Sequence, residues 1–232
     1  MEKNAFKETE GERAPYAKHG EVQAGNINVI AGRMKMIEIR RYIQKQKIDL
    51  VVDATHPFAV EITKNIKEAC QDTGVEYIRL LRMLSEKEDD VVYVSSVESA
   101  VRWLEQTEGN ILITTGSKEL ETYTKLTSFQ ERCYARVLST KESVEESVRL
   151  GLEGEHLIAM QGPYSEEMNI ALIHHVQASY LITKESGNAG GFEEKARAAA
   201  KTGTVLVVVE RPKEEGNTFE EVIERIRECS LQ

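Results

Sequence analysis

The sequence lacks the features that identify membrane, secreted and zinc-binding proteins. No apolar run approaches the length of about 18 residues that a membrane-spanning helix needs. Residues 1–19 carry many charges and no apolar stretch of the kind found in secretory signals. The three cysteines, Cys70, Cys133 and Cys229, are far apart and form no C-x-x-C pair. We therefore expect a cytoplasmic protein with no membrane partner, reduced and buried thiols, and no zinc site.

Basic residues are also fewer than acidic residues. The chain of 232 residues has 30 Lys and Arg against 39 Asp and Glu, which gives a net charge of −9. Nonspecific binding of nucleic acid depends on a basic surface, so we expect no nucleic-acid partner. An anionic small molecule remains compatible with this charge, because a few basic side chains in a cleft can outweigh a negative average.

Several short motifs that would reveal a chemistry are missing as well. The sequence contains no H-E-x-x-H, no G-x-S-x-G, no Walker A motif and no G-x-G-x-x-G. His174 and His175 are adjacent, so on a helix their side chains diverge. These absences predict no metal site. They also mean that none of the common nucleotide-binding motifs indicates a nucleotide site.

What the sequence does have is a regular alternation of strands and helices. Short Val- and Ile-rich runs of the kind buried in parallel sheets occur at 48–54, 75–81, 91–94, 111–115, 133–138, 156–161, 180–183 and 205–209. Helical periodicity appears between them, at 34–46, after Pro57, and at 97–106, 141–150, 165–177, 192–201 and 218–228. In the helix after Pro57, one buried stripe is expected from Phe58, Ile62, Ile66 and Ala69. This alternation predicts an α/β fold with parallel sheets.

The pattern also suggests how the chain divides. Residues 1–25 show little periodicity and are expected to form an irregular arm. Polar segments at 85–90 and 109–110 are candidate breaks between domains. We place an N-terminal domain at 26–107 and a C-terminal domain at 108–232.

The first candidate site follows the strand at 48–54. Asp53, Thr55 and His56 precede Pro57 and the start of a helix. A helix N-terminus offers free N–H groups to an anionic ligand, and histidine is suited to proton transfer near neutral pH. The simpler alternative is that Asp53 or Thr55 only caps the helix.

The second candidate site follows the strand at 111–115. Gly116 permits close approach of a ligand to the backbone, Ser117 can bind a phosphate or carboxylate, and Lys118 supplies a positive charge. A capped helix beside a solvated lysine explains the same residues.

The third candidate site follows the strand at 156–161. Gly162 is followed by a proline, and Tyr164 could stack on a flat ligand. Ser165 could bind a ligand or serve only as a helix N-cap, which is the simpler alternative.

The fourth candidate site is a glycine-rich loop after the strand at 180–183. Gly187, Gly190 and Gly191 fall within five residues, between Lys184 and Lys195. A plain connection rarely needs so much backbone freedom, which favours a loop that shapes a ligand site.

Taken together and in this order, these segments resemble the precorrin-6A reductase family, including the cobalt-precorrin-6A reductases of cobalamin biosynthesis. The resemblance runs from about residue 27 to about residue 212. Its motifs are G-R-M at 32–34, DATHPFA at 53–59 with Asn65, TTGSKEL at 114–120, YARV at 134–137, MQGPYSEEMN at 160–169 and TKESGNAGG at 183–191 with Glu194 and Lys195.

The resemblance implies a function and a set of roles. Members of the family use NADPH to reduce one double bond of precorrin-6A or its cobalt-containing counterpart, giving the 6B form. They have two Rossmann-like domains with the active site in the cleft between them. The substrate is an anionic, tetrapyrrole-derived small molecule with several carboxylates. His56 is the candidate catalytic proton donor, chosen on pKa grounds. The expected cofactor-binding residues are Gly116, Ser117, Lys118, Gly162, Tyr164 and Ser165. The expected substrate-binding residues are Asp53, Thr55, Arg136, Lys184, Glu185, Ser186, Gly187, Gly190, Gly191 and Lys195.

One departure from the family pattern is visible. Family members open with an apolar strand, a Gly-Gly-Thr turn and a helix, and residues 1–25 contain no counterpart of this unit. We therefore expect an incomplete first domain. A non-catalytic tetrapyrrole- or nucleotide-binding remnant of the family is the alternative to an active reductase, and the protein is expected to be a monomer or a homodimer.

Overall fold

A computed structural model describes residues 30, 32, 34–81, 90–186 and 191–229. The expected arm at 1–25 lies outside these residues. The contacts divide the chain into two compact units, Met1–Val51 with Glu61–Tyr77, and Val52–Val60 with Ile78–Gln232. Each unit is described below by itself.

The smaller unit is built on two amphipathic helices, α1 (Met36–Gln46) and α2 (Val60–Thr73). Their apolar faces meet in a small core made of Ile39, Ile43, Ala69 and Cys70. Ile62 and Ile66 pack against this core, as the predicted stripe requires. Strands β1 (Leu50–Asp53) and β2 (Glu76–Arg79) pair as a two-stranded sheet.

The larger unit contains a six-stranded sheet in which every recorded strand pair is parallel. Its strands are β3 (Val91–Val94), β4 (Asn110–Ile113), β5 (Cys133–Val137), β6 (Leu157–Ala159), β7 (Ala178–Lys184) and β8 (Val205–Val209). They lie in the order β3-β8-β7-β4-β5-β6. The α/β fold with parallel strands that the sequence predicts is confirmed.

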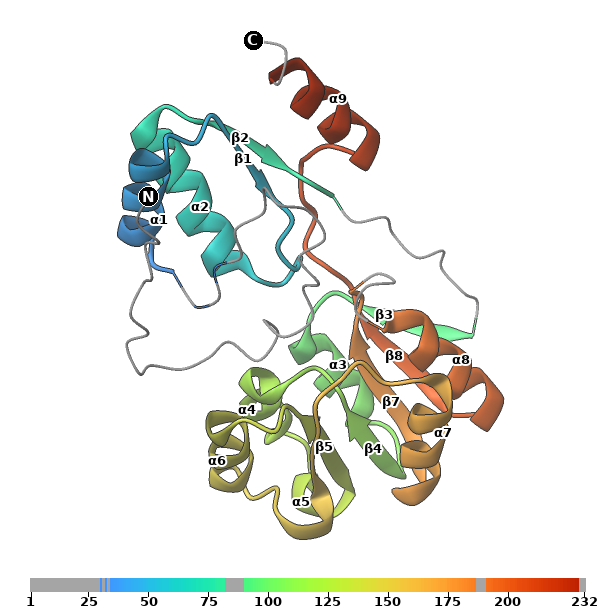
Figure 1. Cartoon of the computed structure of the whole chain (residues 1–232). Coiled ribbons are helices and arrows are strands. Elements are labelled where there is room, and N and C mark those ends of the chain that lie inside the picture. Colours follow the sequence, from blue (N-terminus) through green and yellow to red (C-terminus); the bar gives the residue numbers. More distant parts are fainter. Residues whose placement is uncertain (1–29, 31, 33, 82–89, 187–190, 230–232) are drawn as a thin grey trace. The chain divides into compact units, whose positions relative to one another are not determined.

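Helices cover both faces of this sheet (Figure 1). On one face, Ile111 and Ile113 pack against α3 (Val97–Leu104), α4 (Leu120–Tyr123) and α5 (Phe129–Arg132), beside α6 (Lys141–Arg149). On the other face, Leu112 and Leu181 pack against α7 (Glu166–His175) and α8 (Phe192–Thr202). Successive strand residues therefore enter opposite cores, which explains why the strands read as continuous apolar runs. A last helix, α9 (Phe219–Cys229), follows the sheet.

The strand order contains one reversal, and it determines where a ligand site is expected. After β4 the chain adds β5 and β6 on one side of β4, and then β7 and β8 on the other. In open α/β sheets, ligands bind at the carboxyl ends of the strands where the order reverses. Here that point lies between β4 and β7, and the segments that follow these strands are Thr114–Lys118 and Glu185–Ser186.

Three expectations differ from the structure. The helix after Pro57 begins only at Val60, because Pro57 and Phe58 form a turn in which Ala59 N donates to His56 O. Phe58 therefore packs against the core of the larger unit and is not part of the α2 stripe. The short helices α4 and α5 were not predicted, because four residues show no helical period.

The structure also divides differently from the boundary placed at 107/108. Strand β3 and helix α3, which we assigned to the N-terminal domain, belong to the six-stranded sheet and its core. The reason is that β3 pairs with β8, more than a hundred residues later in the chain, and such a pairing leaves no local signal in the sequence.

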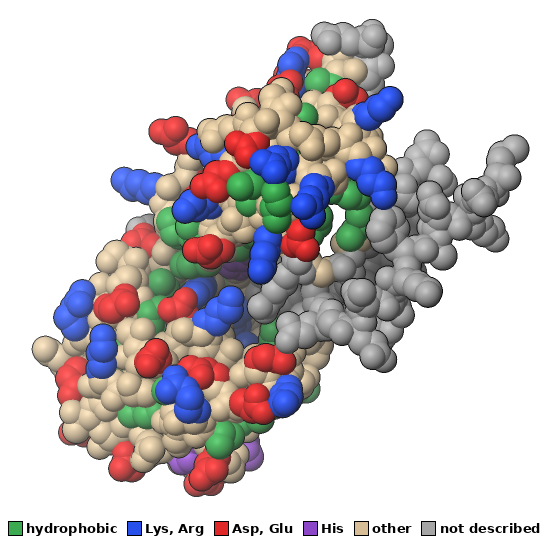
Figure 2. Space-filling view, turned by 90° about the vertical axis from the view of Figure 1, so that its left-hand side faces the viewer, with side chains coloured by type: hydrophobic (Ala, Val, Ile, Leu, Met, Phe, Trp, Pro, Cys, Tyr) green, Lys and Arg blue, Asp and Glu red, His purple; other side chains and the backbone are tan. Residues whose placement is uncertain are grey.

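The surface agrees with the mixed charge of the sequence. On the face shown in Figure 2, acidic and basic side chains alternate and do not form one basic surface. None of the helices in the described part of the chain is long and apolar enough to cross a membrane. Cys70 and Cys133 are buried free thiols, and burial raises the pKa of Cys133 to about 12.

Candidate functional site

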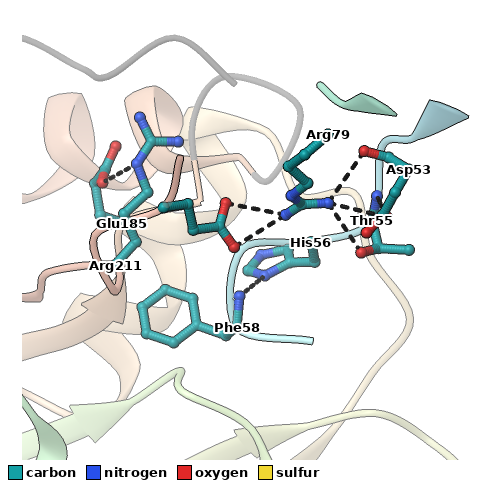
Figure 3. Close-up of polar contacts among 8 residues, drawn as sticks. Asp53, Thr55, His56, Phe58, Arg79, Glu185 and Arg211 are labelled. Carbon is teal, nitrogen blue, oxygen red and sulfur yellow. Dashed lines mark hydrogen bonds and ion pairs between the residues drawn. The ribbon is translucent and has the colours of Figure 1, made fainter. Parts of the chain in front are cut away.

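A buried arginine organises the first candidate motif (Figure 3). Arg79, the last residue of β2, donates through Nη1 to Asp53 Oδ1 at 3.0 Å, to Asp53 O and to Thr55 Oγ1. Its Nη2 donates to both carboxylate oxygens of Glu214, at 3.0 and 3.1 Å. Asp53 Oδ1 also accepts the backbone N–H of Thr55. One guanidinium therefore fixes the turn that leads to His56.

His56 is half-buried and lies in a defined orientation. Its Nδ1 accepts the backbone N–H of Phe58 at 3.3 Å. A ring nitrogen that accepts a hydrogen bond carries no proton, so the proton of a neutral His56 is on Nε2. Nε2 is therefore the nitrogen from which this ring can donate.

Phe58 brings the first motif together with the second and the fourth. The Nζ of Lys184 lies 4.8 Å from the centre of the Phe58 ring. The same Nζ forms an ion pair with Glu119 Oε1 at 2.5 Å. These residues come from the turn after β1, the end of β7 and the short helix after β4, so three of the four candidate motifs converge.

The fourth motif is also tied to the segment that follows β8. Glu185 is buried, its backbone N–H donates to Val209 O, and its carboxylate pairs with Arg211 Nε at 3.1 Å (Figure 3). Ser186 beside it is buried as well. Gly187 and Gly190 lie outside the described residues.

The second motif presents an open backbone. Gly116 has a φ of +95°, and a Cβ placed there would meet nothing within 4 Å. Ser117 donates to the hydroxyl of Ser143 at the start of α6. Lys118 is exposed. The backbone at Gly116 therefore leaves room for a ligand next to the reversal point of the sheet.

The third motif takes a more structural form. Ser165 is the N-cap of α7 and accepts the backbone N–H of Met168. The hydroxyl of Tyr164 donates to Met160 O, and its ring packs against the guanidinium of Arg136 at 4.1 Å. A Cβ on Gly162 would approach the Tyr164 ring to 2.9 Å, so glycine is needed for that packing.

Arg136 and Lys195 are two buried basic side chains of the larger unit. Arg136 is 6% exposed and donates to Asn169 Oδ1 at 2.7 Å. Lys195 is 7% exposed and donates to Gly191 O at 2.8 Å. Burial lowers the pKa of Arg136 to about 10. Burial and the nearby Arg136 lower the pKa of Lys195 to about 8.

Sequence reasoning missed Arg79, Glu119, Arg211 and Glu214. Arg79 had one available signal, because it is a charged residue inside the apolar run at 75–81. No signal in the sequence pointed to Glu214 or Arg211. Glu214, for example, accepts a hydrogen bond from Arg79 although the two residues are 135 positions apart in the chain. In the part of the chain that the structure describes, no group of three or more His, Cys, Asp or Glu residues could hold a metal ion.

Comparison with known proteins gives the family. Residues 14–227 match the family model described as precorrin-6x reductase CbiJ/CobK. The chain is 35% identical over 210 residues to the cobalt-precorrin-6A reductase of Priestia megaterium, covering 88% of this chain and 82% of that protein. It is 35% identical over 194 residues to the protein of that name from Methanothermobacter thermautotrophicus, covering 82% of this chain and 63% of the relative.

A solved structure shares the fold. A solved structure titled CobK precorrin-6A reductase superposes with a TM-score of 0.66 at 21% identity, covering 85% of this chain and 80% of that one. At this identity the structure supports the fold, while the family model and the curated relatives support the assignment. The resemblance read from the motifs is thus confirmed, and the chain belongs to the precorrin-6x reductase family.

Proposed function

We propose that this chain uses NADPH to reduce precorrin-6A, or its cobalt-containing counterpart, to the 6B form. The observation that carries the proposal is the convergence of family motifs in one compact unit, where Phe58, Lys184 and Glu119 meet beside the reversal point of the sheet. The curated relatives that bear the name cobalt-precorrin-6A reductase support the reaction class.

The residues present fit a phosphate-bearing dinucleotide. The open backbone at Gly116 and the neighbouring Ser117 and Lys118 suit a phosphate, because a ligand can approach the backbone at Gly116 and a lysine favours an anion. NADPH supplies the hydride when it is bound, and the protein supplies position and a polar environment. We expect NADPH to be preferred over NADH, because basic residues in these loops can hold a 2′-phosphate.

The protein's own part in the chemistry is to deliver a proton. Reduction of a double bond adds a hydride to one atom and a proton to its neighbour. In our proposal His56 faces the substrate through Nε2–H, because Nδ1 accepts the N–H of Phe58 in the neutral ring. A proton taken up from solvent at Nδ1 makes the ring an imidazolium, and Nε2 then gives its proton to the substrate, which leaves a neutral ring. Arg79 positions His56 indirectly, by holding Asp53 and Thr55, which precede it in the chain.

The remaining predicted residues are assigned to the anionic substrate. Its carboxylates suit the cations of Lys184, Arg136 and Lys195. Glu185 and Ser186 are buried, and Glu185 pairs with Arg211, so in our proposal they shape the loop and do not carry charge to the substrate. Ser165 is the N-cap of α7, and its place among the cofactor contacts stays a prediction.

The test is an assay of the purified chain with both forms of the substrate. NADPH or NADH is added, absorbance of the reduced nicotinamide is followed, and the product is checked by mass for the gain of two hydrogens. We expect oxidation of NADPH that depends on the tetrapyrrole. Tetrapyrrole binding without any oxidation of either nucleotide would overturn the proposal and favour the non-catalytic alternative.

A further inference from the structure

The guanidinium of Arg79 is fixed from two sides, and only one side belongs to the turn that leads to His56 (Figure 3). Nη1 donates to three oxygens of Asp53 and Thr55, while Nη2 donates to both carboxylate oxygens of Glu214. The buried Nε between them finds no acceptor among the described residues. The plane of the guanidinium is therefore set by the turn on one side and by Glu214 on the other.

Glu214 is brought to Arg79 by a segment that packs tightly against the end of β2. Asn217 N donates to Arg79 O at 2.7 Å, and Leu81 N donates to Asn217 O at 2.9 Å. A Cβ on Gly216 would lie 2.5 Å from Arg79 O, so this close approach requires glycine. The backbone that bears Glu214 is thus held in place independently of the ion pair.

Burial gives the Glu214 contact its weight. The side chain of Arg79 is 5% exposed, and that of Glu214 is 20% exposed. A buried cation that loses one carboxylate turns toward the acceptors that remain, because unsatisfied N–H groups in the interior are costly. Since the guanidinium is rigid and planar, turning it displaces Nη1 together with Nη2. Loss of Glu214 should therefore disturb the hydrogen bonds that hold Asp53 and Thr55.

We propose that Glu214 is a positioning residue of the reduction, which acts on His56 through Arg79. This inference rests on the proposed function for the role of His56 as the proton donor. His56 follows Thr55 directly in the chain, so a shift of the turn moves the imidazole relative to the substrate atom that takes the proton. Misplacement of a reacting group by about 1 Å can lower a rate by roughly 10²-fold.

The test combines kinetics with a direct view of the His56 ring. Glu214→Ala removes both acceptors, and Glu214→Gln, which keeps one oxygen and the shape, is the second variant in case the first does not fold. Each is made alone and together with His56→Ala. Glu215→Ala, which removes the exposed neighbouring carboxylate, is the matched control. Arg132→Met is the control for lost hydrogen bonds, because Arg132 donates to carbonyl oxygens that precede β4.

We expect Glu214→Ala to lower kcat by about 10- to 100-fold and to leave the KM values for NADPH and for the tetrapyrrole almost unchanged. Glu214→Gln should lose less, because it still accepts one hydrogen bond. In the His56→Ala background, neither Glu214 variant should lower kcat further, since residues that act through one group are not additive. A loss that reflected only damaged folding would appear in both backgrounds.

The ring of His56 gives a readout that needs no turnover. In NMR spectra of isotope-labelled histidine, at a pH where the ring is neutral, the parent should show the proton on Nε2, because Nδ1 accepts from Phe58 N. Glu214→Ala should shift this signal toward a mixture of tautomers. Glu215→Ala and Arg132→Met should leave it unchanged, and its loss in His56→Ala identifies it.

Three results would overturn the positioning role. One is an unchanged His56 signal in both Glu214 variants, even if kcat falls. Another is an unchanged kcat in both Glu214 variants of an active parent. The last is a loss of kcat by the same factor with and without His56. A parent that binds the tetrapyrrole but oxidises neither nucleotide is a separate outcome, which ends the reductase proposal. The His56 signal then still decides whether Glu214 holds the turn.

Discussion

The guanidinium of Arg79 and the carboxylate of Asp53 lie 3.0 Å apart, with side-chain exposures of only 5% and 0%. Glu214 completes the arrangement on the other side of the guanidinium. A buried ion pair contributes little net stability when it is intact, but removing one partner leaves an uncompensated charge in the interior. Arg79 is therefore a residue whose loss should have consequences out of proportion to its number of contacts.

We predict that Arg79→Met lowers the free energy of unfolding by about 3–5 kcal/mol, the usual cost of breaking a buried pair. Urea unfolding followed by circular dichroism would measure the loss. The matched control is Arg40→Met, which removes a half-exposed ion pair with Asp72 and should cost no more than about 1 kcal/mol. Equal losses in the two variants would show that Asp53 and Glu214 do not depend on Arg79.

Lys195 should give the stability of the protein an unusual dependence on pH. Its pKa is lowered from 10.5 to about 8, so between these values the unfolded chain binds more protons than the folded one. Stability must then rise with pH across this window. Below pH 8 the burial of charged Lys195 costs roughly 3 kcal/mol at full effect, from about 1.36 kcal/mol per pKa unit.

Lys195→Met should therefore be more stable than the parent at pH 7, and the advantage should shrink as the pH rises from 8 to 10.5. Urea unfolding of both proteins at several pH values would measure the difference. Lys201→Met, which removes an exposed lysine of the same helix, is the control for loss of a lysine that is not buried. A constant difference for Lys195→Met would mean that the lysine is not perturbed.

His56 should act on the rate and not on binding of NADPH. General acid–base assistance typically contributes about 10²–10⁴ in rate, so His56→Ala should lower kcat within that range and leave the KM for NADPH almost unchanged. His56→Asn should recover substrate binding but not the rate, because it keeps a hydrogen-bond donor and loses proton transfer. His175→Ala, at the exposed end of α7, is the control.

The competing role for His56 is to anchor a substrate carboxylate. In that case the KM for the tetrapyrrole rises in both His56 variants while kcat holds. Steady-state kinetics on the two variants separate the two roles. Parent-like values of kcat and of both KM values would make His56 only a part of the turn that ends at Ala59.

Gly191 and Gly203 allow a test of the loop that holds Lys195. Both have a φ of +68°, at opposite ends of α8, so alanine should cost each position about 1 kcal/mol in backbone strain. A Cβ at Gly191 would lie 3.7 Å from Lys195 Nζ, which is ordinary contact, whereas a Cβ at Gly203 meets nothing within 4 Å. Thermal unfolding of the two variants should therefore show similar losses.

Only Gly191→Ala should affect the ligand. Strain at Gly191 shifts the carbonyl oxygen that accepts from Lys195, so we expect Gly191→Ala to weaken binding of NADPH or of the tetrapyrrole. Gly203→Ala should lose a similar amount of stability without weaker binding. If both variants bind these two ligands equally well, Gly191 serves the turn and not the site.

Much of the fold could be predicted because its signals are local. The apolar run at Val205–Val209 and the helical period at Phe192–Thr202 each specify an element from neighbouring residues alone. Strand order could not be predicted in the same way. The pairing of β3 with β8 depends on residues far apart in the chain, and this pairing is why the 107/108 boundary does not coincide with the compact units.

The candidate site shows the same division. His56, Lys184 and Gly116 follow strands directly, so the rule that ligands bind at carboxyl ends was enough to select them. The residues that support this site could not be selected in the same way. Nothing near Glu214 or Arg211 in the sequence indicates that these side chains meet Arg79 and Glu185, because only the folded chain brings them together.

The backbone bridge between Leu80 and Asn217 has a consequence for how the protein is made. Asn217 N donates to Arg79 O, and Leu81 N donates to Asn217 O, so a segment near the carboxyl terminus joins residues that were synthesised much earlier. Ribosomes release the N-terminal residues first. The Asp53 turn therefore leaves the ribosome long before Glu214 can reach Arg79. A nascent chain therefore carries Arg79 for most of its synthesis without the Glu214 carboxylate, and chains released before Asn217 lack the hydrogen bonds that Asn217 makes to Arg79 and Leu81.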